Sequence, residues 1–71
     1  MPRYRIRYVH GPNSELTVTD WEEVSAESLA QALAVRSPWP VQENMAATSA
    51  WAKNPGTSLY HVEAWEAELT D

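Results

Sequence analysis

The sequence predicts a small α+β domain spanning residues 1–71, in which one helix packs on one face of a three-stranded antiparallel sheet. Apolar and polar residues alternate over residues 3–9 and again over residues 59–65, which is typical of half-buried strands. Between these runs, Ser28 precedes a segment whose apolar residues lie three and four positions apart, as in an amphipathic helix. The expected order is strand, strand, helix, a short second helix or ordered loop, and strand.

The first two strands are expected to form a β-hairpin. In residues 3–9, apolar and aromatic side chains point to one face and three arginines to the other. Residues 10–14 are mostly turn formers, and a second β-like run begins at Glu15.

The second arm of this hairpin cannot alternate without interruption, because a regular strand would bury the charges of Asp20 and Glu22. A β-bulge inserts one extra residue and shifts the alternation. We therefore expect a bulge near Asp20 that turns Trp21 inward.

The helix is expected to start at Ser28, because Ser28 and Gln31 fit a capping box, with Ser25 as the rival cap. In this pattern the Gln side chain reaches back to the amide of the capping Ser. The sequence Ser37-Pro38 should end the helix, since proline disfavours a helical residue before it.

The second half of the chain is less regular. Residues 38–57 are rich in Ala, Pro and Trp and are interpreted as a short second helix or an ordered loop. Residues 59–65 are predicted to form the third strand, with Tyr60, Val62 and Ala64 facing the helix, and residues 66–71 to form an acidic tail. The predicted core consists of Tyr4, Ile6, Tyr8, Leu16, Val18, Val24, Ala26, Leu29, Leu33, Tyr60 and Val62.

Composition excludes several classes of function. The chain has 71 residues, a formal charge of −5 and no cysteine, so disulfides, thiolate metal sites and a cysteine nucleophile are excluded. No run of 18 apolar residues and no signal-peptide pattern occurs, and a cytoplasmic location is expected. Glycine occurs only at Gly11 and Gly56, so no phosphate-binding glycine loop is present, and neither an enzyme nor a cofactor is expected.

Residues 24–32, Val-Ser-Ala-Glu-Ser-Leu-Ala-Gln-Ala, follow the strand at residues 4–8 and resemble a family of small proteins. The chain is similar here to DpnD/PcfM-like phage and mobile-element proteins, in which a hairpin ending in Val-x-Ala-x-Ser-x-x-Glu-Ala runs into a helix. Gln31 stands where that motif has Glu. The resemblance covers residues 3–36, and it implies a fold and a phage or mobile-element setting but no chemistry.

The predicted binding site is the sheet face opposite the helix. Arginine and tryptophan are frequent in protein interfaces, and covering a bare face would also stabilise so short a chain. We therefore expect a non-enzymatic module that binds a protein partner or a second copy of itself, as a dimer. The predicted contact residues are Arg3, Arg5, Arg7, His61, Glu63 and Trp65.

Three alternatives remain open from sequence. The arginines at positions 3, 5 and 7 could follow the backbone of a single-stranded nucleic acid, although the acidic composition of the rest of the chain disfavours this. His10, His61 and Glu63 could hold a metal, but spacing of this kind is common by chance and no metal site is expected. The acidic body could also act as a nucleic-acid mimic.

Overall fold

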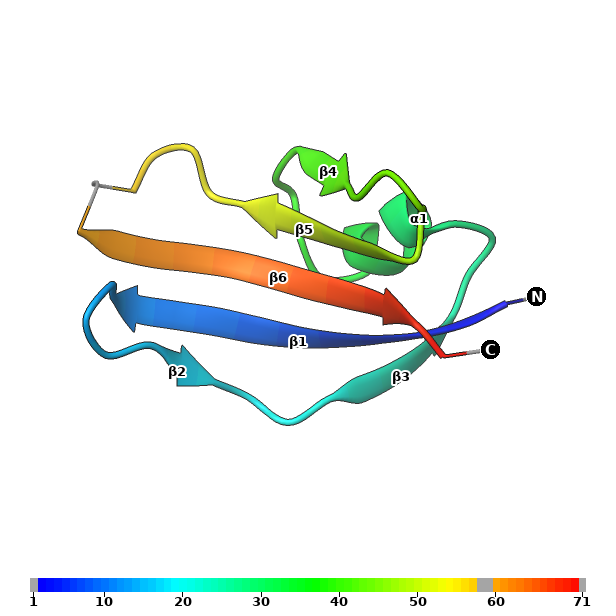
Figure 1. Cartoon of the computed structure of the whole chain (residues 1–71), viewed down its shortest axis with the longest axis horizontal. Helices are drawn as coiled ribbons and strands as arrows, with labels where there is room; N and C mark the ends of the chain where they lie inside the picture. Colours follow the sequence, from blue (N-terminus) through cyan, green and yellow to red (C-terminus); the bar gives the residue numbers. More distant parts are fainter. Residues whose placement is uncertain (1, 58–59, 71) are drawn as a thin grey trace.

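The structure, a computed structural model, describes residues 2–57 and 60–70, and in these residues the chain folds mainly as one antiparallel sheet (Figure 1). The sheet order is β2-β1-β6-β5-β4, and β3 pairs with β1 on the same edge as β2. The elements are β1 (Arg3–Pro12), β2 (Thr17–Val18), β3 (Glu22–Ser25), α1 (Leu29–Ala34), β4 (Val41–Glu43), β5 (Ser49–Lys53) and β6 (His61–Leu69).

The predicted α+β fold with a three-stranded sheet is therefore wrong. The described residues form a 6-stranded sheet, and α1 contains 6 residues. Residues 41–53 form a β-hairpin in place of the predicted second helix or loop, and the predicted second arm of the first hairpin is divided into β2 and β3. Residues 66–69 continue β6 in place of the predicted acidic tail.

The long strands β1 and β6 form the centre of the sheet. They pair from Tyr4 opposite Leu69 to Pro12 opposite His61. Directly opposite residues in an antiparallel pair point to the same face of the sheet. The side chains of Ile6 and Ala67 thus face α1, and the neighbouring positions face the other way. We call these two sides the helix face and the open face.

The register corrects the predicted orientation of the last strand. Val62 lies opposite Gly11 and Ala64 opposite Val9, so both are on the open face and not under the helix. Tyr60, also predicted to face the helix, precedes β6 and is 80% exposed. The β6 residues on the helix face are Trp65, Ala67 and Leu69. They are the odd-numbered positions of the strand, whereas the prediction chose the even-numbered ones. Leu59 and Asp71, at the predicted start of the strand and end of the tail, lie outside the described residues.

The β4–β5 hairpin turns at residues 44–48. The Asn44 side-chain oxygen accepts hydrogen bonds from the backbone amides of Thr48 and Ser49, at 2.9 and 3.2 Å. Ala47 in this turn has a φ of 55°, a left-handed conformation that is strained for a residue with a Cβ. In β5, Ala50 and Ala52 lie on the helix face, and their small side chains let α1 approach the sheet closely.

The bulge is present where it was predicted. Val18 lies opposite Val9 and Glu22 opposite Ile6, so three residues, 19–21, stand opposite the two residues 7–8. The Thr19 hydroxyl accepts a hydrogen bond from the Tyr8 amide at 2.9 Å. The extra residue turns Trp21 onto the open face, however, and not into the core as expected.

Gly11 is required where β1 turns into β2. Its φ of 120° is unfavourable for any residue with a Cβ, and a Cβ there would lie 3.1 Å from the carbonyl oxygen of Glu15. β1 continues to Pro12, so the turn begins later than the predicted residues 10–14, and the Glu15 amide closes it onto the Pro12 carbonyl oxygen at 2.9 Å.

The helix starts where the sequence predicts. The Ser28 hydroxyl accepts a hydrogen bond from the Gln31 amide at 3.1 Å. The Gln31 side chain accepts one from the amide of Glu27, and not from that of Ser28 as the capping-box pattern predicts. One side of α1 packs on the helix face. The buried core contains Tyr4, Ile6, Ala26, Leu29, Ala32, Leu33, Ala50, Ala52 and Ala67.

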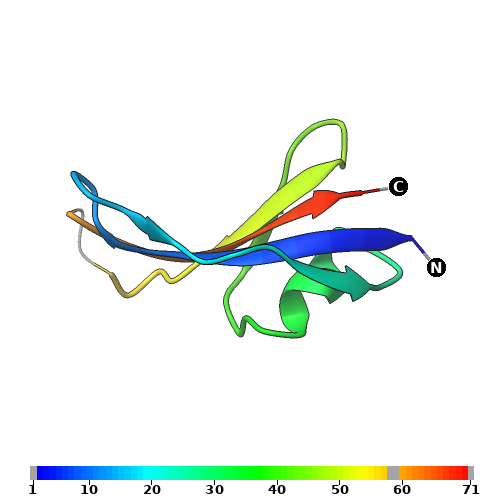
Figure 2. The same ribbon diagram turned by 90° about the horizontal axis from the view of Figure 1, so that it is seen from below.

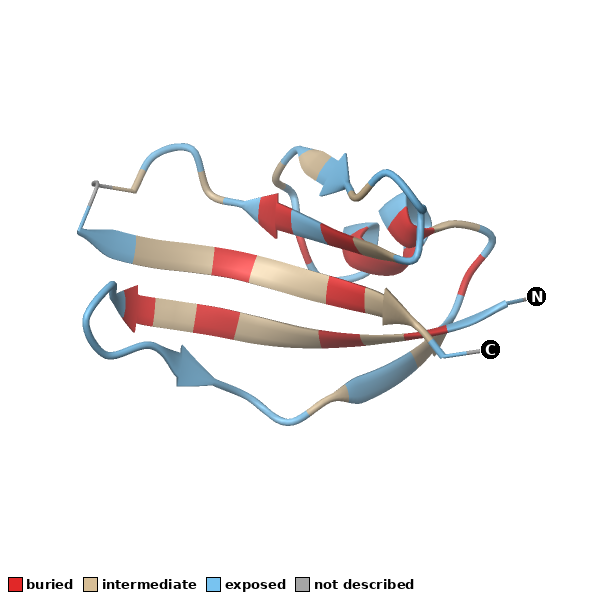
Figure 3. Ribbon diagram, viewed as in Figure 1, coloured by how far each residue is buried: buried red, intermediate tan, exposed pale blue. Residues whose placement is uncertain are grey.

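The core prediction is confirmed near the helix and wrong at the other end of the sheet. Tyr4, Ile6, Ala26, Leu29 and Leu33 are buried, and Tyr8, Val24 and Val62 are half-buried. Leu16 and Val18 are exposed: Val18 lies opposite Val9 and therefore on the open face, away from α1, and β2 is an edge strand at the end of the sheet far from the helix (Figures 2 and 3).

Candidate interaction face

The open face is the candidate functional site, because α1 packs on the other side of the sheet and leaves this side free (Figure 2). The strand registers and the position of Trp21 define which side chains it carries. It holds four of the five basic residues of the chain. Its members around the centre of the sheet are Arg3, Arg5, Arg7, Trp21, Glu23, Gln42, Ser49, Trp51, Lys53, Glu66 and Glu68.

Two arginine–glutamate pairs cross the middle of the open face from β1 to β6. Arg5 donates from Nε and Nη2 to one carboxylate oxygen of Glu68, at 3.1 and 2.6 Å. Arg7 donates in the same way to Glu66, at 3.1 and 3.0 Å. All four side chains remain 31–42% exposed, so each pair contributes little stability, about 0–1 kcal/mol. The pairs form a row of positive groups beside a row of negative groups.

Trp21 lies over the arginine row. The guanidinium carbons of Arg5 and Arg7 lie 4.4 and 4.2 Å from the centroid of its ring. At these distances the ring attracts both cations electrostatically and restricts the orientations of their side chains. The bulge that places Trp21 therefore also organises the arginines of the open face.

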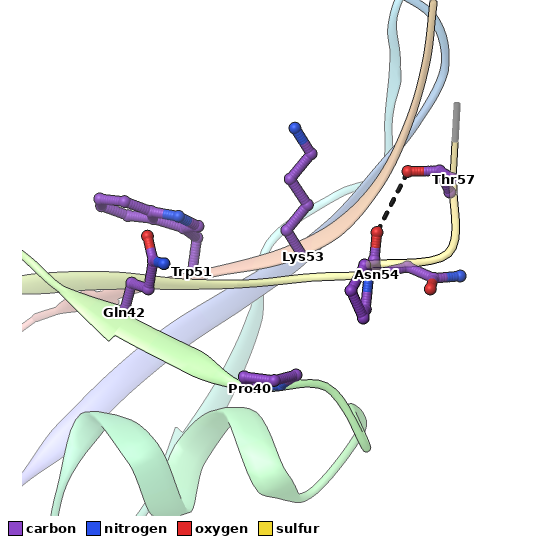
Figure 4. Close-up of a pocket in the computed structure, with 7 residues that line it drawn as sticks. Pro40, Gln42, Trp51, Lys53, Asn54 and Thr57 are labelled. Carbon is purple, nitrogen blue, oxygen red and sulfur yellow. Dashed lines mark hydrogen bonds between the residues drawn. The ribbon is translucent and has the colours of Figure 1, made fainter. Parts of the chain in front are cut away.

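On the other side of the glutamate row stands Trp51 of β5, which lies opposite Glu66 and is 40% exposed. Trp51 and Lys53 extend to the same side of β5, with Gln42 of the neighbouring β4 beside Trp51 (Figure 4). A shallow groove of about 390 Å³ adjoins them. It is lined by Pro40, Gln42, Trp51, Lys53, Asn54, Pro55 and Thr57. Within the described part of the chain, Lys53 forms no ion pair.

The structure divides the predicted contact residues between the two faces. Arg3, Arg5 and Arg7 lie on the open face as expected. Trp65 and Glu63 are opposite Tyr8 and His10, and His61 is opposite Pro12, so these three residues lie on the helix face, where Trp65 packs against the core. The predicted six-residue site does not come together on one surface.

The part of the helix face that α1 leaves uncovered carries an aromatic cluster. The Tyr8 ring stacks on His10, with centroids 4.9 Å apart, and lies 5.0 Å from Trp65. Burial, followed by the hydrogen bond and the negative charge of Glu63, raises the pKa of the Tyr8 hydroxyl. In the described part of the chain, no group of three or more His, Asp or Glu side chains could hold a metal ion.

Of the open-face residues, the predicted contact set contains only the three arginines. The sequence prediction places Glu66 and Glu68 in a tail, Trp51 in a helix or loop, and Trp21 in the core. One signal was available: Glu66 and Glu68 alternate with Ala67 and Leu69, the pattern of a strand with one charged face.

No known family model matches the chain, and comparisons with curated proteins and with solved structures find no significant match. The resemblance to DpnD/PcfM-like proteins stays a prediction. No helix among the described residues is long and apolar enough to cross a membrane.

Proposed function

We propose that the protein is a non-enzymatic binding module and that its open face contacts another protein. One observation carries this proposal: the face opposite α1 displays exposed Trp51 on one side of the glutamate row, and Trp21 over the arginines on the other side. Tryptophan and arginine contribute disproportionately to binding energy in protein interfaces, because both bring large contact area and directional polar groups. The resemblance to DpnD/PcfM-like proteins supports a further part of this proposal, that the protein is an accessory protein of a phage or mobile element.

The Arg–Glu pairs argue against the alternative, binding of single-stranded nucleic acid along β1. Phosphate binding is favoured when cationic side chains replace the counterions condensed on the nucleic acid and release them, and here Arg5 and Arg7 each already have a carboxylate within 3.1 Å. A nucleic acid would have to displace these carboxylates. The other two tryptophans, Trp39 and Trp65, pack against the core and are not offered for stacking on bases.

The experiment is a comparison of two exposed apolar residues on different surfaces. Trp51→Ser should reduce binding of the protein to its partner at least tenfold, because a hot-spot tryptophan contributes about 2 kcal/mol or more. Val35→Ser, at an exposed position at the end of α1, should leave binding unchanged. The partner is captured on immobilised wild-type protein and identified by mass spectrometry, and its affinity for each variant is then measured by calorimetry.

Equal affinity of the two variants would place the contact surface elsewhere. Binding of single-stranded DNA or RNA that weakens steeply with salt and is lost in Arg5→Gln would favour the nucleic-acid alternative. Circular dichroism of each variant serves as the control for folding.

A further inference from the structure

We propose that the open face binds a second copy of the same chain, face to face, about a two-fold axis that runs along the strands between β1 and β6. This inference rests on the proposed function, since it names the partner of the same face. The argument comes from the order and register of the charged rows.

The register makes the open face complementary to itself. Arg5 and Glu68 are at one level along the strands, and Arg7 and Glu66 are at the next. A two-fold axis parallel to the strands exchanges β1 and β6 but keeps each level unchanged. In the resulting pair, the arginine row of one copy faces the glutamate row of the other, level by level. Each carboxylate then lies between an arginine of its own chain and one of the second copy.

The tryptophans obey the same symmetry. Trp21 lies just outside β1, over Arg5 and Arg7, and Trp51 lies one strand outside β6, at the level of Glu66 and Arg7. The axis therefore brings Trp51 of one copy opposite Trp21 of the other, on both sides of the charged rows. Aromatic anchors that meet across an interface are the usual source of its binding energy. The exposed Trp51 ring would gain a partner in this arrangement.

Charge and area agree with a second copy as the occupant. The chain carries −5 overall, but four of its five basic residues are on the open face, so two copies can approach there without the repulsion expected elsewhere. The molecule extends over 36 × 22 × 21 Å, so the outline of its broadest side is about 800 Å². A face of this size is large enough for a standard stable interface, which buries about 800 Å² on each partner. Two twisted sheets pack in this way with their strands within about 30° of each other.

The test exploits the fact that each Arg–Glu pair could act within a chain or between chains. Arg5→Glu places like charges at one level of the interface, and Glu68→Arg does the same with the opposite sign. Each variant alone should be a monomer by analytical ultracentrifugation at a concentration at which the wild type is a dimer. An equimolar mixture should form a heterodimer, because the new carboxylate at position 5 of one chain then faces the new guanidinium at position 68 of the other. The double variant, with both changes in one chain, should dimerise as the wild type does.

A second pair of variants, Arg7→Glu and Glu66→Arg, tests the adjacent level independently and replaces the first pair if one of its members fails to fold. A mixture that remains monomeric while the folded single variants are monomeric would overturn the proposal, because it would show that the charges act only within a chain. A monomeric wild type would also overturn it. Neither result would affect binding of a different protein that is lost in Trp51→Ser, so failure of this inference and failure of the proposed function are distinguishable.

Discussion

At the scale of single residues, the four tryptophans lie in three different environments. Trp39 and Trp65 pack against the core, Trp21 lies over two guanidinium groups, and Trp51 is exposed. Tryptophan is rarely buried completely, so some of the four are expected to remain accessible, but composition does not say which. Strand register decides this, because a shift of one residue exchanges the faces of all side chains in a strand.

Tyr8 gives a prediction for alkaline pH. Burial and Glu63 raise the pKa of its hydroxyl, so the folded state holds this proton more tightly than the unfolded state does. The resulting stabilisation is fully present below the pKa of an unfolded tyrosine, about 10, and is lost as the pH rises through the higher folded pKa. Glu63→Gln should lower the Tyr8 pKa, because the negative charge is removed. NMR titration of the Tyr8 ring measures this directly.

The control variant is Tyr8→Phe. In urea denaturation of the wild type, the free energy of unfolding should decrease as the pH rises through the Tyr8 pKa. Tyr8→Phe has no hydroxyl to ionise and should not show this decrease. An unchanged titration midpoint of Tyr8 in Glu63→Gln would contradict the role assigned to Glu63.

At the scale of secondary-structure elements, the β4–β5 turn is a site of strain. Ala47 has a φ of 55°, where a Cβ costs about 1–2 kcal/mol and glycine has no such cost. Part of the gain from glycine is offset by the greater entropy of the unfolded chain. Ala47→Gly should therefore raise the free energy of unfolding by up to about 1 kcal/mol, measured by urea denaturation.

The control for this turn is the neighbouring Ala46, which is also exposed and does not have a positive φ. Ala46→Gly should leave the protein slightly less stable, by about 0.5–1 kcal/mol, because only the unfolded chain gains freedom. Stabilisation by both substitutions, or by neither, would refute the conformation described for Ala47.

The elements that the sequence predicts correctly are those whose signals are local. The strand around Ile6, the bulge near Asp20 and the cap at Ser28 each depend on a few adjacent residues. The β4–β5 hairpin was missed because alanine favours helices and is uncommon in strands. Ala50 and Ala52 occur in β5 because α1 packs closely over them, a tertiary requirement that overrides propensity and that no local pattern expresses.

The candidate site was predicted in part for a similar reason. The arginine row follows from alternation within one strand, so its placement on the open face could be predicted from the sequence. The assignment of His61, Glu63 and Trp65 to the same face required the pairing of two strands that are separated by about fifty residues. The polar and apolar residues of β6 occur on both of its faces, so its own pattern does not specify the register.

At the scale of the whole molecule, a 71-residue sheet with one short helix leaves a large fraction of its surface uncovered. The β1–β2 end extends beyond α1, and exposed Leu16 and Val18 lie there (Figure 2). A chain of this size gains stability from association, because a partner that binds only the folded state shifts the folding equilibrium by mass action. Stability and self-association are thus expected to be coupled.

This coupling predicts a melting temperature that depends on protein concentration. For a native dimer that unfolds to separate chains, a 100-fold increase in concentration adds about 2.7 kcal/mol per dimer, which corresponds to a rise of roughly 5–10 °C for chains of this length. Differential scanning calorimetry between about 2 and 200 μM measures this shift, over the range in which many dimers associate. Trp51→Ser should remove the concentration dependence, because it deletes the exposed anchor, whereas Val35→Ser should retain it. A wild-type melting temperature that is constant over this range would mean that the chain folds and unfolds as a monomer, and that the stability of its exposed sheet comes from contacts within the chain.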